Sequence, residues 1–395
     1  MNESKMKKTL LKLLFFSLLF ESVPLFAQNR LEKEYNMFRD KDVIVKQQVK
    51  YKNPGRAGAN VLWNFSKQEA VNEKYKVSYS QPDLDSIVTG CEHRTLYHYQ
   101  LRNDSLYSLG YENPTTMMQY QKPELLMTFP FSYQKRVEGY FYGTGSYCRR
   151  LDLTTQGKTV TWGDAHGMII LPNGDTLQHV LRVRSLKKIA EKMFHYELKD
   201  SVVSHIVFPD SIEHHLNNDS VYIQVETYRW YADGYRYPIF ETVESTTYKN
   251  GKPLKLFNTA FFYSPEKHAY LNEDEKNLAR LEELDKAARE RPSGGNGNSD
   301  DNNQSNPEKE IINYNVYIEN GSNRISVEYN LSQPAEVTIN LFDMQGRLLA
   351  NYPKKNCSSG FYQESISLDG YQLGEYLLRI VVNGYVYGEK IAKQN

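Results

Sequence analysis

Short alternating segments separated by two-residue turns are the feature that most constrains this chain. Asn173-Gly174, Asp233-Gly234 and Asn250-Gly251 each stand between runs in which apolar and polar residues alternate. Such pairs are the strongest short-range signal for a β-hairpin, because the turn needs a positive φ. Successive hairpins make neighbouring strands antiparallel, whereas parallel strands need long crossovers. We therefore predict an all-β fold built on a curved antiparallel sheet.

The residue types in these runs agree with strands. Residues 43–51, 96–101, 180–184 and 221–228 are rich in β-branched and aromatic side chains. The chain has 31 tyrosines, whose apolar rings and polar hydroxyls suit strands with one solvated face. Arg182 and Arg184 share one face of their strand, and we expect each to pair with an Asp or Glu.

One long helix is predicted after these strands, over residues 272–291. Leu278, Leu281 and Leu284 form a narrow apolar stripe, which favours a helix lying on the domain surface. Asn272 is the expected cap. A second, short helix is predicted near residues 66–70.

The chain divides into four parts. Residues 1–27 have the basic start, short apolar run and small-residue exit of a secretory signal peptide, with cleavage after Ala27. The apolar run is shorter than the roughly 20 residues of a membrane-spanning helix. Residues 28–291 are the β-rich domain, and residues 292–310, rich in Gly, Ser, Asn and Asp, are a predicted flexible linker. In residues 311–395, about seven short strands with regular turns predict a small β-sandwich.

Charge and cysteine content narrow the classes of function. The chain has 48 basic and 48 acidic residues, so no basic excess favours nucleic acid as a partner. Its three cysteines form no zinc-binding spacing with histidine. Cys91 and Cys148 are candidates for a disulfide in an exported protein, and Cys357 falls in a predicted loop.

No specific catalytic motif is present. Residues 143–146 are the nearest to a glycine-rich nucleophile or phosphate loop, but they lack the following lysine and helix. A hairpin between tyrosine-rich strands is the better interpretation. His214-His215 is interpreted as an exposed polar turn, and His93 and His98 have opposite strand parity. Asp164 and His166 share a parity and are a weak candidate for a carboxylate–imidazole pair. No catalytic, cofactor or metal site is therefore predicted.

Three short stretches occur in a characteristic order near the end of the chain. They are Asp343-x-x-Gly346-Arg347, Gly374-x-Tyr376 and the segment 388–391, which contains Lys390. In this order they resemble the C-terminal sorting domain, type A, of the Bacteroidota type IX (Por) secretion system. The resemblance covers most of residues 311–395. It implies a β-sandwich that the secretion machinery recognises as its partner, and that is often cleaved at the cell surface.

Residues 167–184 and 228–239 are similar to a second group, the cargo regions of secreted Bacteroidota proteins. A G-x-x-x-L-P-x-G hairpin, a strand of the type V-L-R-V and a W-Y-x-x-G-x-R-x-P segment recur there. The similarity implies no catalytic residues.

Together these features predict an exported protein that leaves by the Sec pathway for the cell surface or the extracellular space, with the periplasm as the alternative. We favour a non-catalytic protein that is structural or binds a glycan or apolar ligand on a concave, tyrosine-lined face of the sheet. No cofactor and no transmembrane segment are expected. The alternative is a secreted hydrolase acting on glycans or peptides, which needs converging Asp, Glu or His side chains.

Overall fold

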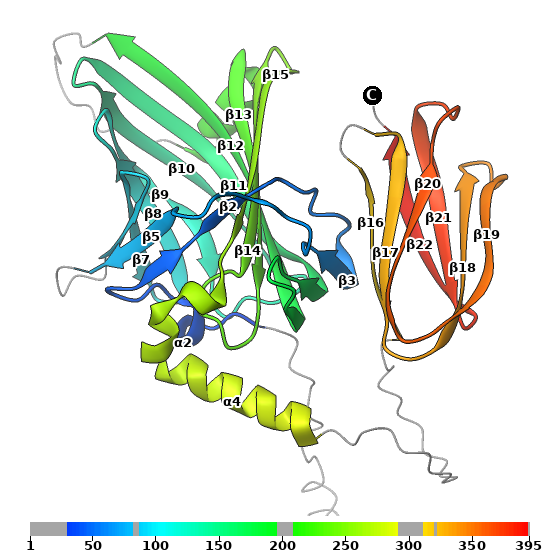
Figure 1. Cartoon of the computed structure of the whole chain (residues 1–395). Coiled ribbons are helices and arrows are strands. Elements are labelled where there is room, and N and C mark those ends of the chain that lie inside the picture. The colour runs from blue at the N-terminus through cyan, green and yellow to red at the C-terminus, as the bar shows by residue number, and fades with distance from the viewer. Residues whose placement is uncertain (1–29, 82–86, 196–207, 291–310, 320–321, 394–395) are drawn as a thin grey trace, which may run out of the picture.

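A computed structural model describes residues 30–81, 87–195, 208–290, 311–319 and 322–393 (Figure 1). The predicted signal peptide (1–27) and linker (292–310) lie outside these residues. The described chain is mostly strand, with a large antiparallel sheet and a separate four-stranded antiparallel sheet near its end, so the predicted β-rich class is confirmed.

The large sheet closes on itself. Strands β1 (Val43–Val45) and β2 (Gln47–Val49) are one extended segment, interrupted only at Lys46. One edge of this segment pairs antiparallel with β4 (Ala70–Asn72) and β5 (Lys76–Ser80), and the Lys46 amide bridges the gap by donating to the Tyr75 carbonyl at 2.8 Å. The other edge of β2 pairs antiparallel with β15 (Lys252–Phe262). The segment formed by β1 and β2 thus pairs with β4 and β5 on one edge and with β15, the last strand of the ring, on the other. The ring therefore has no free edge there.

The remaining strands of the ring follow the chain, each antiparallel to the next. They are β6 (Ile87–Glu92), β7 (Thr95–Arg102), β8 (Ser105–Glu112), β9 (Thr116–Thr128), β10 (Arg136–Tyr147), β11 (Leu151–Ile170), β12 (Thr176–His195), β13 (Val221–Tyr231) and β14 (Phe240–Lys249). The predicted turns at Asn173-Gly174 and Asn250-Gly251 connect β11 to β12 and β14 to β15.

The hairpin of β11 and β12 is longer than its neighbours and carries a second core. Strand β10 pairs with β11 only as far as Trp162, and β3 (Gly58–Asn64) continues that edge as a parallel partner from Ala165 onward. The apolar side chains of this part pack closely, with the Phe65 and Phe240 rings stacked at 3.8 Å between centres. This core places β3 between the ring and the C-terminal unit (Figure 1).

The helices agree only in part with the sequence. The predicted long helix is α4 (Glu275–Glu290), but Asn272 lies in a preceding 3-10 turn (Ala269–Glu273), and Asp274 is the side chain that accepts the Asn277 amide, at 3.5 Å. The predicted helix near residues 66–70 is wrong, because this segment is a turn that leads into β4. Helices α2 (Lys33–Asn36) and α3 (Pro209–Asn218) were not expected from the sequence.

The C-terminal unit, residues 311–319 and 322–393, has the seven predicted strands. They are β16 (Ile312–Ile318), β17 (Arg324–Leu331), β18 (Ala335–Asp343), β19 (Leu348–Cys357), β20 (Gly360–Ser367), β21 (Gly374–Val382) and β22 (Tyr385–Lys393). Strands β18, β19, β21 and β22 form the separate four-stranded sheet. Strands β16, β17 and β20 pair with one another, and their apolar side chains share one core with the four-stranded sheet.

A buried ion pair fixes the second core. Arg182 on β12 and Asp164 on β11 form two parallel hydrogen bonds of 2.9 and 2.8 Å, and their side chains are 1% and 2% exposed. The same guanidinium donates to the carbonyl oxygens of Pro54 at 2.6 Å and Arg56 at 2.9 Å. The expected acidic partners are confirmed, since Arg184 pairs with Glu226 in a more exposed position.

Replacing Arg182 by Leu should lower the free energy of unfolding by about 3–5 kcal/mol, because Asp164 would remain buried without its cation. Arg184→Leu on the same strand is the matched control, with an expected loss of about 1 kcal/mol or less. Urea unfolding of both variants measures the difference. Equal losses would contradict the structural role given to Arg182.

Candidate functional site

The closed sheet surrounds a cavity of about 350 Å³. Side chains on a strand alternate between its two faces, so every second residue of the ring points inward. Tyrosine dominates the lining. The tyrosines that reach the cavity are Tyr79, Tyr97, Tyr99, Tyr111, Tyr120, Tyr231, Tyr237 and Tyr263.

A glycine makes room for two of these rings. A Cβ atom on Gly90 would lie 3.0 Å from Cε1 of Tyr79 and 3.2 Å from Cε2 of Tyr99. A larger residue at position 90 would therefore have to displace both tyrosine rings. The small residue on β6 and the large residues on β5 and β7 together set the width of the cavity.

The residue that interrupts the closing strand is also the central charge of the cavity. Lys46 Nζ lies 2.7 Å from Glu92 and 2.9 Å from Glu241, and 4.2 Å from the ring centre of Phe261. Arg229 Nε donates to the same Glu241 at 2.6 Å. Burial works against the charge of Lys46, but Glu241, Tyr263 and Glu92 together outweigh it and raise the pKa of Lys46 well above its ordinary value. Burial alone would also raise the pKa of Glu241, yet Lys46 and Arg229 lower it to about 2.

A second charged pair lies elsewhere on the cavity wall. Lys187 Nζ is 2.7 Å from Glu124, whose other oxygen accepts a 2.6 Å hydrogen bond from the Thr159 hydroxyl. The same ammonium lies 4.6 Å from the ring centre of Phe141. Burial opposes the charge of Lys187, but Glu124 and Tyr120 together outweigh it and raise the pKa of the lysine.

Charge in the lining is balanced, and the lining also contains tyrosine hydroxyl groups. The lining cations Lys46, Lys187 and Arg229 face the lining carboxylates Glu92, Glu124 and Glu241. The Tyr263 side chain also lines the cavity, and the residue is 6% exposed. A hydroxyl in such a position needs a hydrogen-bond partner, and water or a ligand in the cavity can supply one.

The N-terminal segment covers one part of the cavity. Phe38 belongs to the lining, and its ring stacks on Tyr79 at 4.6 Å between centres. Arg236 fixes this segment by donating to the carbonyl oxygens of Glu34 at 3.2 Å and Met37 at 2.9 Å. Its guanidinium is in turn held by Asp274 at 2.6 and 2.8 Å, just before α4.

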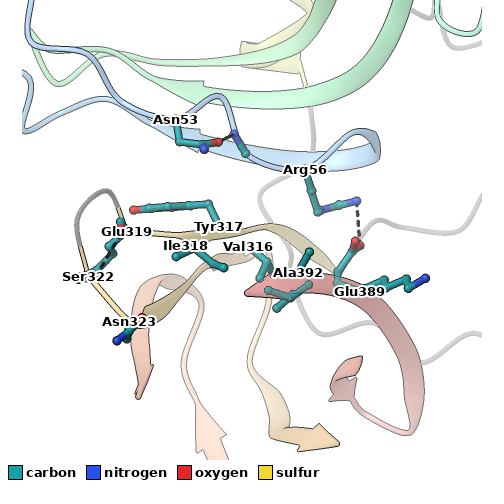
Figure 2. A pocket seen from close by; sticks show the side chains of 13 residues that line it. Asn53, Arg56, Val316, Tyr317, Ile318, Glu319, Ser322, Asn323, Glu389 and Ala392 are labelled. Atoms are coloured by element: carbon teal, nitrogen blue, oxygen red, sulfur yellow. Dashed lines mark hydrogen bonds and ion pairs between the residues drawn. The ribbon is translucent and has the colours of Figure 1, made fainter. Parts of the chain in front are cut away.

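A second hollow of about 720 Å³ lies between the N-terminal domain and the C-terminal unit. Figure 2 shows its lining, with Asn53 and Arg56 on one side and Tyr317, Asn323 and Glu389 on the other. It is an open groove where two units meet, and among its described lining residues Arg56 pairs with Glu389 across it. We therefore take the internal cavity as the candidate functional site.

The structure corrects several interpretations of individual residues. Asp164 and His166 do not pair, because Asp164 binds Arg182 and His166 packs against Tyr133 at 4.7 Å. Burial, and next to it Arg56, lowers the pKa of His166.

The histidine and glycine interpretations also change. His214 and His215 lie on α3 and not in a turn, since His215 contacts Asp219 one turn later at 3.2 Å. Gly143 lies within strand β10 and not at a hairpin turn. A Cβ atom added to it would be 2.4 Å from Tyr120. Within the described ranges, no group of three His, Cys, Asp or Glu side chains could hold a metal ion.

The residues of the sorting motif lie on neighbouring strands of the four-stranded sheet. Asp343 is paired with Tyr376, and Tyr376 with Ile391, so three strands bring the motif together. Gly346 has φ +82° in the β18–β19 turn, where Arg347 donates to Asp343 through its amide at 2.9 Å and its Nε at 2.6 Å. Gly374, with φ +148°, starts β21, and Lys390 on β22 pairs with Glu375 at 2.7 Å. Their role in sorting stays a prediction.

The three cysteines are free in the structure, which therefore does not contain the hypothesised disulfide between Cys91 and Cys148. Cys148 is exposed in the turn after β10, whereas Cys357 is buried at the end of β19 and not in a loop.

Comparison with family models and with curated proteins gives no match for this chain. None of the helices in the described ranges has both the length and the apolar character that crossing a membrane requires.

Acid should destabilise the ring through Glu241. Its pKa is about 2 in the folded protein against an ordinary 4.5, so the folded state gains stability above pH 4.5 and loses it as the pH falls toward 2. The loss should amount to roughly 3 kcal/mol. Urea unfolding at several pH values should show a smaller dependence for Glu241→Gln. Glu138→Gln, at an exposed position of β10, should leave the dependence unchanged, and the same slope in all three proteins would contradict this assignment.

The exposed Cys148 and the buried Cys357 should differ in reactivity toward a thiol reagent. Reduction should leave the mass of the protein unchanged. Native protein treated with a thiol reagent should be labelled rapidly at Cys148 and only after denaturation at Cys357. Peptide mass spectrometry locates the label. A mass increase of two hydrogens on adding reductant would show a disulfide and contradict the free thiols.

Proposed function

We propose that this is an exported, non-catalytic protein whose N-terminal domain binds a small uncharged ligand inside its closed sheet. The tyrosine-lined cavity of about 350 Å³ is the observation that supports this proposal. Such a volume lies at the lower end of the roughly 300–1,000 Å³ of small-molecule sites. It corresponds to roughly a dozen water molecules at ~30 Å³ each.

The balance of charges indicates an uncharged ligand. Glu241 is shared by Lys46 and Arg229, and Glu124 is bound by Lys187. A charged ligand would have to displace one partner and leave a buried charge unpaired, which is costly. An uncharged ligand leaves these pairs intact.

The tyrosines indicate which uncharged groups the ligand carries. Their rings offer flat apolar surfaces, and hydroxyls such as that of Tyr263 offer hydrogen-bonding groups at the cavity wall. A molecule with both apolar faces and several hydroxyls satisfies both properties. A short neutral glycan or glycoside is therefore the ligand class that we propose, in preference to a purely apolar ligand.

The alternative, a secreted hydrolase, lacks a comparable supporting observation. Glycoside hydrolysis by two carboxyl groups needs one that stays protonated near neutral pH. Glu241 has the opposite property, since its pKa is lowered to about 2 in spite of burial.

For the C-terminal unit we propose a sorting-type β-sandwich that the type IX secretion machinery binds. The order of the three motif stretches and their neighbouring positions on β18, β21 and β22 support this role. With the predicted signal peptide, it favours a location at the cell surface or outside the cell.

A matched set of ligands tests binding in the cavity. We would titrate the mature chain with neutral p-nitrophenyl glycosides of glucose, galactose, mannose and N-acetylglucosamine, and with the anionic p-nitrophenyl glucuronide, by calorimetry. We expect at least one neutral glycoside to bind, and the glucuronide to bind at least ~10-fold more weakly because of its unpaired charge. Tighter binding of the glucuronide, or no binding by any neutral member, would contradict the proposal.

Two variants of β12 locate the bound glycoside. Ser185 lines the cavity, so Ser185→Phe should fill it and abolish binding. Lys188 is outside the lining, so Lys188→Phe should bind as the natural chain does. Binding that survives Ser185→Phe would place the ligand elsewhere.

A further inference from the structure

Arg56 of the N-terminal domain contacts the C-terminal unit through several interactions. The Arg56 guanidinium lies 3.7 Å from the ring centre of Tyr314 on β16, and its Nε donates to the Tyr314 carbonyl at 3.1 Å. Its Nη1 is 3.3 Å from Glu389 on β22, an ion pair that Figure 2 shows across the groove. Glu389 also accepts a 2.7 Å hydrogen bond from the Tyr314 hydroxyl. One side chain of the first domain thus contacts two strands of the second.

A second ion pair crosses the same boundary. Lys52 Nζ lies 3.1 Å from Glu328 on β17, 2.6 Å from the Asn64 carbonyl and 4.9 Å from the ring centre of Tyr317. Glu328 is 2% exposed, and the Tyr317 hydroxyl donates to it at 2.9 Å. Removing the N-terminal domain would deprive this carboxylate of its cation.

Between these two pairs the backbone of the loop lies against the Asn315 side chain of β16. The Arg56 amide donates to Oδ1 of Asn315 at 3.1 Å, and a Cβ on Gly55 would lie 2.2 Å from that same oxygen. Gly55 has φ +71°, so both its conformation and its surroundings require glycine. On the strand edge nearby, Tyr314 of β16 pairs with Val61 of β3. The fit is therefore specific to the shape of both units.

The loop that makes these contacts is also hydrogen-bonded to the core of its own domain. Arg182 donates to the carbonyl oxygens of Pro54 and Arg56, and Asp164 fixes Arg182. A loop ordered before contact loses little conformational freedom on binding, which favours a stable association.

We propose that residues 52–56 form a docking loop that keeps the C-terminal unit bound even when the chain is cut between the two parts. The partner of this surface is the β16, β17 and β22 face of the chain's own C-terminal unit. Cleavage within residues 292–310 then yields a two-piece complex and not a released N-terminal domain.

Cutting the natural chain tests this directly. A site for a specific protease, inserted within residues 292–310 of the mature chain, allows complete cleavage, and size-exclusion chromatography with native mass spectrometry follows. We expect both pieces to elute together at micromolar concentration. Separate elution of two folded pieces would overturn the proposal without the need for any variant.

Two variants and a control assign the association to the loop. Arg56→Ala and Glu389→Gln should each weaken the cut complex at least ~30-fold, because each leaves a partner group unpaired. Lys50→Ala is the control, since Lys50 is exposed and pairs with Glu69 of its own domain at 2.5 Å. Circular dichroism checks that each variant is folded. If the folded Arg56→Ala protein associates as tightly as Lys50→Ala, the loop does not carry the docking.

Discussion

The closed ring depends on one buried lysine. Lys46 interrupts the strand that joins the two ends of the sheet, and its side chain enters the cavity between Glu92 and Glu241. A buried ammonium is costly unless it is paired, so this position stabilises the fold only because β6 and β14 each supply a carboxylate. Closure of the sheet and the charges of the cavity therefore depend on the same residue. Lys46 lies in the segment that closes the ring, and it is also the centre of the charged lining.

A second buried cation, Arg182, organises the other half of the molecule. It joins β11 and β12 through Asp164 and positions the loop that reaches the C-terminal unit. Three aromatic rings lie around its guanidinium, those of Trp63, Tyr228 and Trp230. The V-L-R-V and W-Y segments of this sequence thus have a structural explanation, because their arginine and aromatic residues form one buried unit. That explanation needs no catalytic role for them.

Local patterns predicted the elements of the fold better than their assembly. Alternation and Asn-Gly turns identified the strands and hairpins, since both signals depend on near neighbours in the chain. Closure of the sheet depends on Val43–Val45 meeting Lys76–Ser80 and on Gln47–Val49 meeting Ala260, and no local pattern encodes such distant pairs. The mistaken turn at His214-His215 has a similar cause, because the apolar contacts of Ile212 and Leu216 with the sheet favour the helix.

The candidate site was foreseen only as a tyrosine-lined concave face. The abundance of tyrosine in the strands suggested the apolar and hydroxyl groups of this face, but the charges were missed. Lys46, Glu92 and Glu241 lie far apart in the sequence, and each alone resembles an ordinary surface residue. Only the closed register brings them within hydrogen-bonding distance.

The most direct measurement of the central claim is a crystal structure of the mature chain at a resolution that shows ordered water. We expect Lys46 to lie between Glu92 and Glu241 in an unbroken ring, with water or a bound molecule in the cavity at the Tyr263 hydroxyl. A sheet that is open between β2 and β15, or an interior filled by the tyrosine side chains themselves, would contradict it.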